Sequence, residues 1–168
     1  MGQDKESAAI DAILLDKIHV EKFYLREATI ADAELLYQWR NDVTVRQYAF
    51  HSEPVEFAEH LRWLEKTLAD RFAHLFIMVN DIIPIGQIRV NQQDEEYVVS
   101  YSIDEHFRGH ALGRHMLTLL VQWMKAKVGH GILAALVKKE NLASQHTFEK
   151  LGYQRTEEHN FYRYTKRF

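Results

Sequence analysis

The chain has 168 residues, of which 46% are hydrophobic and 12% aromatic, and its formal net charge at pH 7 is -3. This length and hydrophobic content predict one domain with a full core and exclude intrinsic disorder. The slightly acidic balance offers no electrostatic footprint for nucleic acid. The absence of cysteine excludes disulfides, thiolate metal sites and a cysteine nucleophile, and it fits a cytoplasmic location. No apolar run approaches the ~20 residues that span a bilayer, so we expect no membrane partner.

Residues 1–22 are predicted to be an N-terminal extension that precedes a single domain over residues 23–168. Within the extension, the run AAIDAILLDKI places isoleucines and leucines at helical spacing and predicts a short amphipathic helix. Packing of this helix on the domain and its exchange between protomers both stay open.

The first half of the domain is predicted to hold a strand, two helices and two further strands. Thr29 with Asp32 forms a near capping box that opens the first helix. Ser52 is expected to cap the second helix, with Pro54 in its first turn, where a missing N–H costs little. Residues 43–50, between the two helices, are predicted to be a loop. Strands are predicted over residues 19–26, 75–79 and 85–91.

The second half is predicted to be organised around a strand, a short turn and a long helix. β-Branched and aromatic residues over 97–103 favour the strand, and apolar residues at helical spacing over 112–123 favour the helix. Residues 132–137 form a continuous apolar run, typical of a buried strand parallel to its predecessor. Asn141 then caps a helix that Gly152 ends, and a hairpin closes the chain. This order predicts an α/β domain, a mixed sheet with helices on both faces.

The turn between the central strand and the long helix is rich in small residues and arginine. Gly109, Ala111 and Gly113 keep side chains away from the backbone, so that several N–H groups can converge on one anion at a helix N-terminus. Arg108 and Arg114 flank this turn and add charge-assisted contacts. The glycine spacing fits neither G-x-x-x-x-G-K-[ST] nor G-x-G-x-x-G. The turn is therefore predicted to hold phosphate, by a motif different from both.

This turn resembles the R/Q-x-x-G/A-x-G/A signature of GNAT acetyltransferases, with Arg108, Ala111 and Gly113 at its three defining positions. The predicted order of elements also resembles the GNAT fold from about Phe23 onward. The resemblance implies a mostly antiparallel mixed sheet whose two parallel central strands splay apart. It also implies acetyl-coenzyme A as co-substrate. The residues expected to contact it are Tyr101, Ser102, Ile103, Arg108, Gly109, His110, Ala111, Leu112, Gly113, Arg114, Asn141 and Ser144.

A second segment, from Asn141 to Tyr153, resembles the N-x-x-S/A…E-K-x-G-F/Y stretch of the same family. Many relatives carry a tyrosine there that protonates the leaving thiolate, but this chain has Phe148, which has no proton to give. The N-x-x-S pattern of related branches suggests Ser144 as a substitute that hydrogen-bonds the departing sulfur. A surface position on the helix is the alternative for Ser144.

Acetyl transfer to an amine requires a neutral nucleophile, so a base must accept a proton directly or through water. Glu96, at the start of the central strand, is the candidate, and a solvated acidic turn with its neighbours is the alternative. His74 and His106 are further candidates, with surface or capping positions as their alternatives. The ten histidines show no H-x-x-x-H or H-E-x-x-H spacing, so we predict no metal.

The amino-terminal half resembles a branch of the family that acetylates a UDP-linked 4-amino-4,6-dideoxy sugar. The resemblance rests on LREA, LYQWRND, HLRWL and IGQIRV, with WRND as its most specific part. Trp39 and Trp63 fall on helical stripes and are predicted to be core, with stacking on uracil or the sugar as the alternative. The residues expected to contact the nucleotide sugar are Arg40, Arg46, Tyr48 and Arg89.

Two other functions stay open at this stage. One is N-terminal acetylation of a protein, because the WRND block also occurs in the ribosomal-protein-like group. The other is a non-catalytic acyl-coenzyme-A-binding module, suggested by Phe148 and by the lack of an obvious base. A homodimer is compatible with the fold.

Overall fold

A computed structural model describes residues 22–168 of the protein. The helix predicted within the N-terminal extension lies outside these residues. Among the described residues, no helix is both long and apolar enough to cross a membrane.

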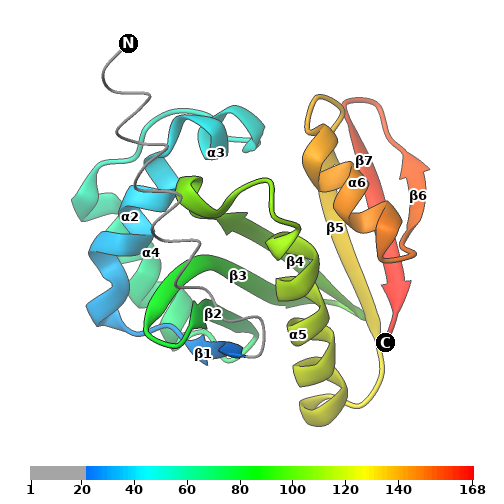
Figure 1. Ribbon diagram of the computed structural model, residues 1–168, viewed down its shortest axis with the longest axis horizontal. Helices are drawn as coiled ribbons and strands as arrows, with labels where there is room; N and C mark the ends of the chain where they lie inside the picture. The colour runs from blue at the N-terminus through cyan, green and yellow to red at the C-terminus, as the bar shows by residue number, and fades with distance from the viewer. Residues whose placement is uncertain (1–21) are drawn as a thin grey trace.

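The described residues form one seven-stranded sheet in the order β1-β2-β3-β4-β5-β7-β6 (Figure 1). Every neighbouring pair is antiparallel except β4 and β5, which are parallel. This arrangement confirms the mixed, mostly antiparallel sheet predicted from the sequence. The strands are β1 Phe23–Glu27, β2 Ala73–Asn80, β3 Ile83–Gln93, β4 Glu96–Ile103, β5 Ile132–Lys138, β6 Gln154–Glu157 and β7 Phe161–Arg167.

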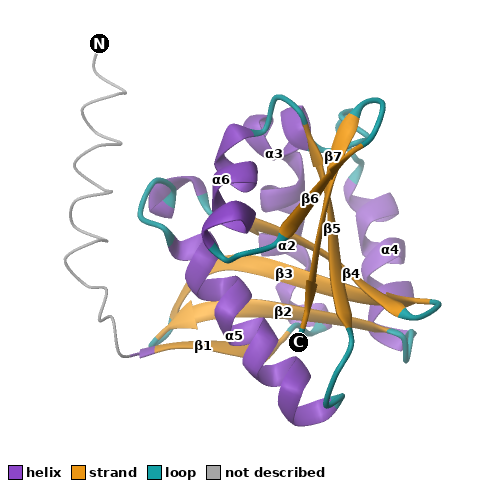
Figure 2. Cartoon of the chain, turned by 90° about the vertical axis from the view of Figure 1, so that its right-hand side faces the viewer, coloured by secondary structure: helices purple, strands orange, loops and turns teal. Residues whose placement is uncertain are grey.

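Helices cover both faces of the sheet, because successive side chains of β2 point to opposite faces and both sets are apolar. Leu75 and Ile77 pack in a cluster with buried residues of α2 (Ala33–Asn41) and α4 (Phe57–Ala69). Phe76 and Met78 point the other way, into the larger cluster with α5 (Leu112–Lys127) and α6 (Leu142–Lys150). Figure 2 shows α5 and α6 on one side of the strands and α4 on the other.

The predicted capping box is confirmed at the start of the first helical segment. The Thr29 and Asp32 side chains cap each other's backbone around a short 3-10 helix, η2 (Ile30–Asp32). Arg26 of β1 donates two hydrogen bonds to the same carboxylate, at 2.8 and 2.6 Å. This guanidinium holds the pKa of Asp32 below its usual value, against the opposing effect of burial.

The segment between α2 and α4 differs from the prediction. Residues 43–48 form a helix, α3 (Val43–Tyr48), because the Asp42 carboxylate caps it by accepting from Val45 N at 2.9 Å. The α4 helix begins at Phe57 with Glu56 as its N-cap, so the predicted cap at Ser52 is wrong. The Asn41 side chain instead bonds both backbone groups of Val55, at 2.8 and 2.9 Å, and holds the preceding residues outside the helix.

The carboxyl-terminal half follows the prediction closely. The Asn141 side chain caps α6 by accepting from Ser144 N at 3.1 Å, and Gly152 follows the helix with φ +75°, a conformation that suits glycine. The β6–β7 hairpin closes the chain. This half therefore places Asn141 and Ser144 at the start of α6, beside the end of β5.

Candidate active site

The parallel central strands pair over only part of their length. Three residue pairs join them, beginning with Glu96 and Ile132 and ending with Val98 and Ala134. Beyond Val98 the remaining residues of β4 have no β5 partner, so the two strands diverge into a wedge. The divergence exposes strand backbone groups to whatever enters the wedge.

A cavity of about 1110 Å³ occupies this wedge and continues toward α2, α3 and α4. One end is lined by β4, β5, the turn before α5, and the first two turns of α6. The other end is lined by side chains of α2, α3, α4 and β3. We refer to these as the phosphate end and the acceptor end.

The turn before α5 has the conformation of an anion-binding nest. Gly109 and Ala111 have positive φ, +80° and +60°, and Ala111 is the N-cap of α5. The amides of Arg114 and His115 bond the Ala111 carbonyl, so those of Leu112 and Gly113 precede the helical hydrogen bonds, as the first amides of a helix do. A Cβ at Gly113 would lie 2.9 Å from Cε2 of Tyr101, so this position has no room for a side chain. These residues fit a pyrophosphate bound by backbone amides.

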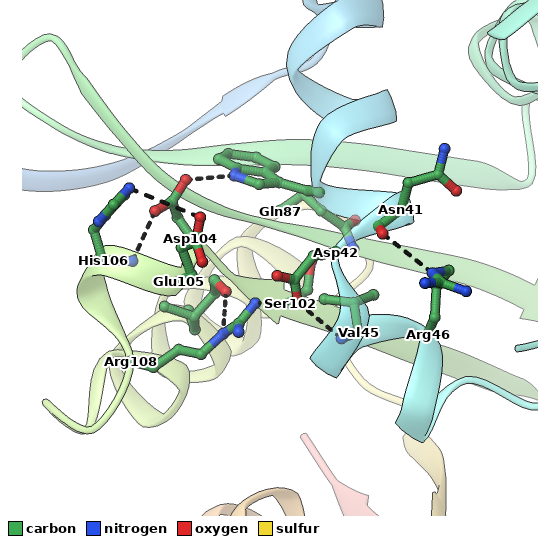
Figure 3. A network of polar contacts seen from close by, with 12 residues as sticks. Asn41, Asp42, Val45, Arg46, Gln87, Ser102, Asp104, Glu105, His106 and Arg108 are labelled. Atoms are coloured by element: carbon green, nitrogen blue, oxygen red, sulfur yellow. Dashed lines mark hydrogen bonds and ion pairs between the residues drawn. The ribbon is translucent and has the colours of Figure 1, made fainter. Parts of the chain in front are cut away.

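Arg108 is held by the protein itself (Figure 3). Its Nη2 donates to Asp42 Oδ1 at 2.7 Å and its Nε donates to the Ile103 carbonyl at 3.0 Å. The ion pair ties the turn after β4 to the junction of α2 and α3. Arg108 therefore braces the phosphate turn, whereas Arg114 also lines the cavity and has no such brace. His110 is outside the cavity lining.

Tyr101 of β4 meets Ser144 and Phe148 of α6 at the phosphate end of the cavity. The Tyr101 hydroxyl lies 3.3 Å from Ser144 Oγ, and the Thr147 side chain also hydrogen-bonds it. The Tyr101 and Phe148 rings pack edge to face, with centroids 6.0 Å apart. Burial raises the pKa of the Tyr101 phenol above its ordinary value, and these two hydroxyl groups offset part of that rise.

The acceptor end combines aromatic rings with arginine. The Arg89 guanidinium lies 5.4 Å from the centre of the Trp63 ring, and burial lowers the pKa of Arg89. Arg40 donates to the His51 carbonyl at 2.9 Å, while its buried Nη1 has no partner in the structure. Trp63 is 36% exposed and lines the cavity, so its prediction as core is wrong. Trp39 is buried as predicted, with its indole N–H on Asp104 at 2.7 Å.

His60 lines the acceptor end and is only 3% exposed. Its Nδ1 is buried without a hydrogen-bond partner. Burial lowers the pKa of His60, and the charge of Arg40 lowers it further. The imidazole is therefore kept neutral near pH 7.

Some of the site residues predicted from the sequence line the cavity, and others lie outside it. Tyr48 lines the cavity, but Arg46 does not, because its guanidinium bonds the carbonyls of Asn41 at 3.1 Å and Ser52 at 3.3 Å. Glu96 also lies outside the lining, in an ion pair with Arg163 of β7.

The other two candidate bases lie outside the cavity lining as well. His74 packs against Phe76 and Trp123, and His106 sits beside Glu105 in the turn after β4. Among residues 22–168 there is no group of three or more acidic or histidine side chains that could hold a metal ion.

Sequence reasoning missed the phenol of Tyr101, the imidazole of His60 and the amide of Gln87. Gln87 Nε2 donates to Ser102 Oγ at 3.2 Å, across the β3–β4 pair at the cavity wall. The signal for His60 was its helical spacing with Leu64, which places both on the buried face of α4. The other two carried no local signal.

Comparison with known proteins decides the family. Residues 22–154 match the family model described as an acetyltransferase (GNAT) domain. The chain belongs to the GNAT acetyltransferase family. The uncharacterized protein MJ1062 of Methanocaldococcus jannaschii is 28% identical over 139 residues, which are 80% of this chain but only 28% of that protein. The chain thus spans little more than a quarter of that relative's length.

Solved structures share the fold. A domain from Methanocaldococcus jannaschii has a TM-score of 0.78 and 24% identity, and the match covers 88% of this chain and 99% of that one. RimL, a ribosomal L7/L12 alpha-N-protein acetyltransferase in complex with coenzyme A, has a TM-score of 0.76 and 14% identity over 89% and 95% of the two chains. At these identities the likeness concerns the fold.

Proposed function

We propose that this protein transfers the acetyl group of acetyl-coenzyme A to a primary amine, in the cytoplasm. The observation that carries the proposal is the wedge between β4 and β5 that ends at the nest of residues 109–113, within a GNAT domain. A wedge with free strand backbone suits the amide-bearing arm of coenzyme A, and the nest suits its pyrophosphate.

Acetyl-coenzyme A supplies an activated thioester, and the chain supplies binding and orientation. The backbone of Tyr101, Ser102 and Ile103, on the unpaired part of β4, would bond the arm and polarise the acetyl carbonyl. Leu112 and Gly113 would donate their amides to phosphate. The Asn141 side chain caps α6. It would therefore act on the coenzyme A arm indirectly, by holding the start of that helix in place. Rate then comes chiefly from holding amine and thioester in reacting geometry.

The acceptor end favours an amine that also carries negative charge. Among the described residues that line the cavity, Glu59 is the only carboxylate, whereas Arg40 and Arg89 of the acceptor end are cationic and bond no carboxylate in the structure. Burying a guanidinium without an anion costs free energy that an anionic ligand would offset. A nucleoside diphosphate has such charge, and Trp63 and Tyr48 offer flat surfaces to a base or sugar. We propose a UDP-linked 4-amino-4,6-dideoxy sugar as the acceptor.

The test is release of thiol from acetyl-coenzyme A with three acceptors. These are a UDP-4-amino-4,6-dideoxyhexose, a peptide with a free N-terminus, and spermidine, a polycation. We expect release with the nucleotide sugar alone. Release with the peptide alone would overturn the sugar assignment in favour of protein N-terminal acetylation, and release with spermidine alone would overturn the anionic acceptor. Coenzyme A binding without release by any amine would indicate the non-catalytic module.

A further inference from the structure

The α6 position at which many relatives carry a tyrosine is Phe148 in this chain, and it has no acidic group. Phe148 is 2% exposed, and its ring packs against Tyr164 and Tyr153 with centroids 5.4 and 5.0 Å away. Phenylalanine has no proton to give. A proton for a leaving thiolate must therefore come from another wall of the cavity.

The neighbouring strand β4 supplies a phenol. Tyr101 is on β4, at the part of the strand that has left β5, and its ring lies against both Phe148 and the first turn of α5. Its hydroxyl reaches Ser144 and Thr147 on α6. Tyr101, Ser144 and Phe148 line the same cavity. The missing functional group of α6 is thus present, contributed by a neighbouring strand.

We propose that Tyr101 is the acid that protonates the leaving thiolate of coenzyme A, and that Ser144 is the positioning residue that orients its hydroxyl. The inference rests on the acetyl transfer proposed above. When the carbon–sulfur bond of the tetrahedral intermediate breaks, its electron pair goes to sulfur, and sulfur takes the proton of Tyr101 Oη. The proton that the amine nitrogen loses on becoming an amide returns, through water, to the phenolate. Atoms and charge then balance as amine plus thioester to amide plus thiol.

Chemical matching favours the phenol over the serine hydroxyl as the proton source. The ordinary pKa of a phenol is about 10 and that of a thiol about 8.5, so proton transfer between them is nearly balanced. An aliphatic hydroxyl is a far weaker acid, and Ser144 serves better as an acceptor or donor to Tyr101. Burial raises the pKa of Tyr101, which weakens the phenol as an acid, and the hydrogen bonds of Ser144 and Thr147 offset part of this rise.

The test compares Tyr101→Phe with Tyr153→Phe. The Tyr153 ring also packs edge to face with Phe148, its hydroxyl is buried without a hydrogen-bond partner, and it lies outside the active-site cavity. This variant therefore makes the same chemical deletion beside the same ring. We expect Tyr101→Phe to lower kcat by about a hundredfold or more with coenzyme A affinity retained, and Tyr153→Phe to leave both unchanged. Ser144→Ala should lower kcat by a smaller factor.

A second measurement needs no acceptor. The thiol of bound coenzyme A is titrated by its thiolate absorbance, and loss of a hydrogen bond to the thiolate in Tyr101→Phe should raise the thiol pKa by about 1, or about tenfold in the constant. Unchanged kcat and thiol pKa would overturn the proposal. If no acceptor of the panel is acetylated, the acceptor assignment fails while this titration still decides the role of Tyr101. If Tyr101→Phe fails to fold, Ser144→Ala with Thr147→Val removes the partners of the phenol and is titrated in its place, and an unchanged thiol pKa there would also overturn the proposal.

Discussion

The two ends of the cavity are built in different ways. The turn at the phosphate end is made of consecutive residues, 109–113, whose backbone amides are proposed to bind the anion. The acceptor end is made of side chains from separate elements, with Arg40 on α2, His60 on α4 and Arg89 on β3. Backbone recognition depends on local conformation, whereas side-chain recognition depends on packing between distant segments. The phosphate end therefore tolerates little change of shape, and the acceptor end little change of charge.

The largest effect is expected from filling the nest with Gly113→Trp. A side chain there meets the Tyr101 ring at its first carbon and displaces the anion, so we expect coenzyme A affinity to fall by about a hundredfold or more, the equivalent of one or two charge-assisted hydrogen bonds. Calorimetric titration measures this. Gln122→Trp, which adds the same bulk at an exposed position of α5, is the control and should bind as the wild type does. Unchanged affinity in Gly113→Trp would remove the nest from the binding site.

Arg89→Met should affect the other end alone. The change keeps most of the apolar contact with Trp63 but removes the half-buried charge, so we expect kcat/KM for the nucleotide sugar to fall by about tenfold to hundredfold, with coenzyme A affinity unchanged. Steady-state kinetics at saturating acetyl-coenzyme A measure this. Arg62→Met, on the exposed face of α4, is the matched control. A parallel loss of coenzyme A affinity in Arg89→Met would contradict the separation of the two ends.

The smallest effect is a pH dependence of stability that originates at His60. Because the pKa of His60 is lowered in the folded state, the unfolded chain binds the proton more readily, and the free energy of unfolding falls as pH drops below about 6.5. His60→Phe keeps an aromatic ring among Tyr37 and Trp63 and should flatten this dependence between pH 7 and pH 5. Urea unfolding at the two pH values measures it.

Asp32 acts in a separate, more acidic window. Because its pKa is lowered in the folded state, the free energy of unfolding falls only near and below about pH 4.

Local signals in the sequence predicted much of the site. The small residues of the phosphate turn, the cap at Asn141 and the apolar run of β5 each act through their nearest neighbours, and the structure places them as expected. The same reasoning missed α3, because its cap depends on the Asp42 side chain and its end on the extended backbone at Ala49. The exposure of Trp63 was missed because helical spacing indicates one face of a helix but not how far the core extends beneath it.

Long-range pairings were beyond prediction. Arg108 was expected to meet phosphate, yet it is tied to Asp42, 66 residues away along the chain. Glu96 was a candidate base, and its partner Arg163 is 67 residues away. In both cases the residue type and its place on an element were predicted from the sequence, while the partner depended on which strands and helices pack together.

The sequence by itself determined the family, the conformation of the turn before α5 and the order of the elements apart from α3, because each depends on local conformation and on hydrophobic periodicity. Only the tertiary structure decided which side chains share the cavity. It brought the phenol of Tyr101 to Ser144, placed the half-buried Arg89 beside Trp63 without a carboxylate, and left Arg46 and Glu96 outside the cavity lining. The physical reason is that charge and hydrogen bonding act across space, so a residue's chemistry is set by neighbours that the chain order does not reveal.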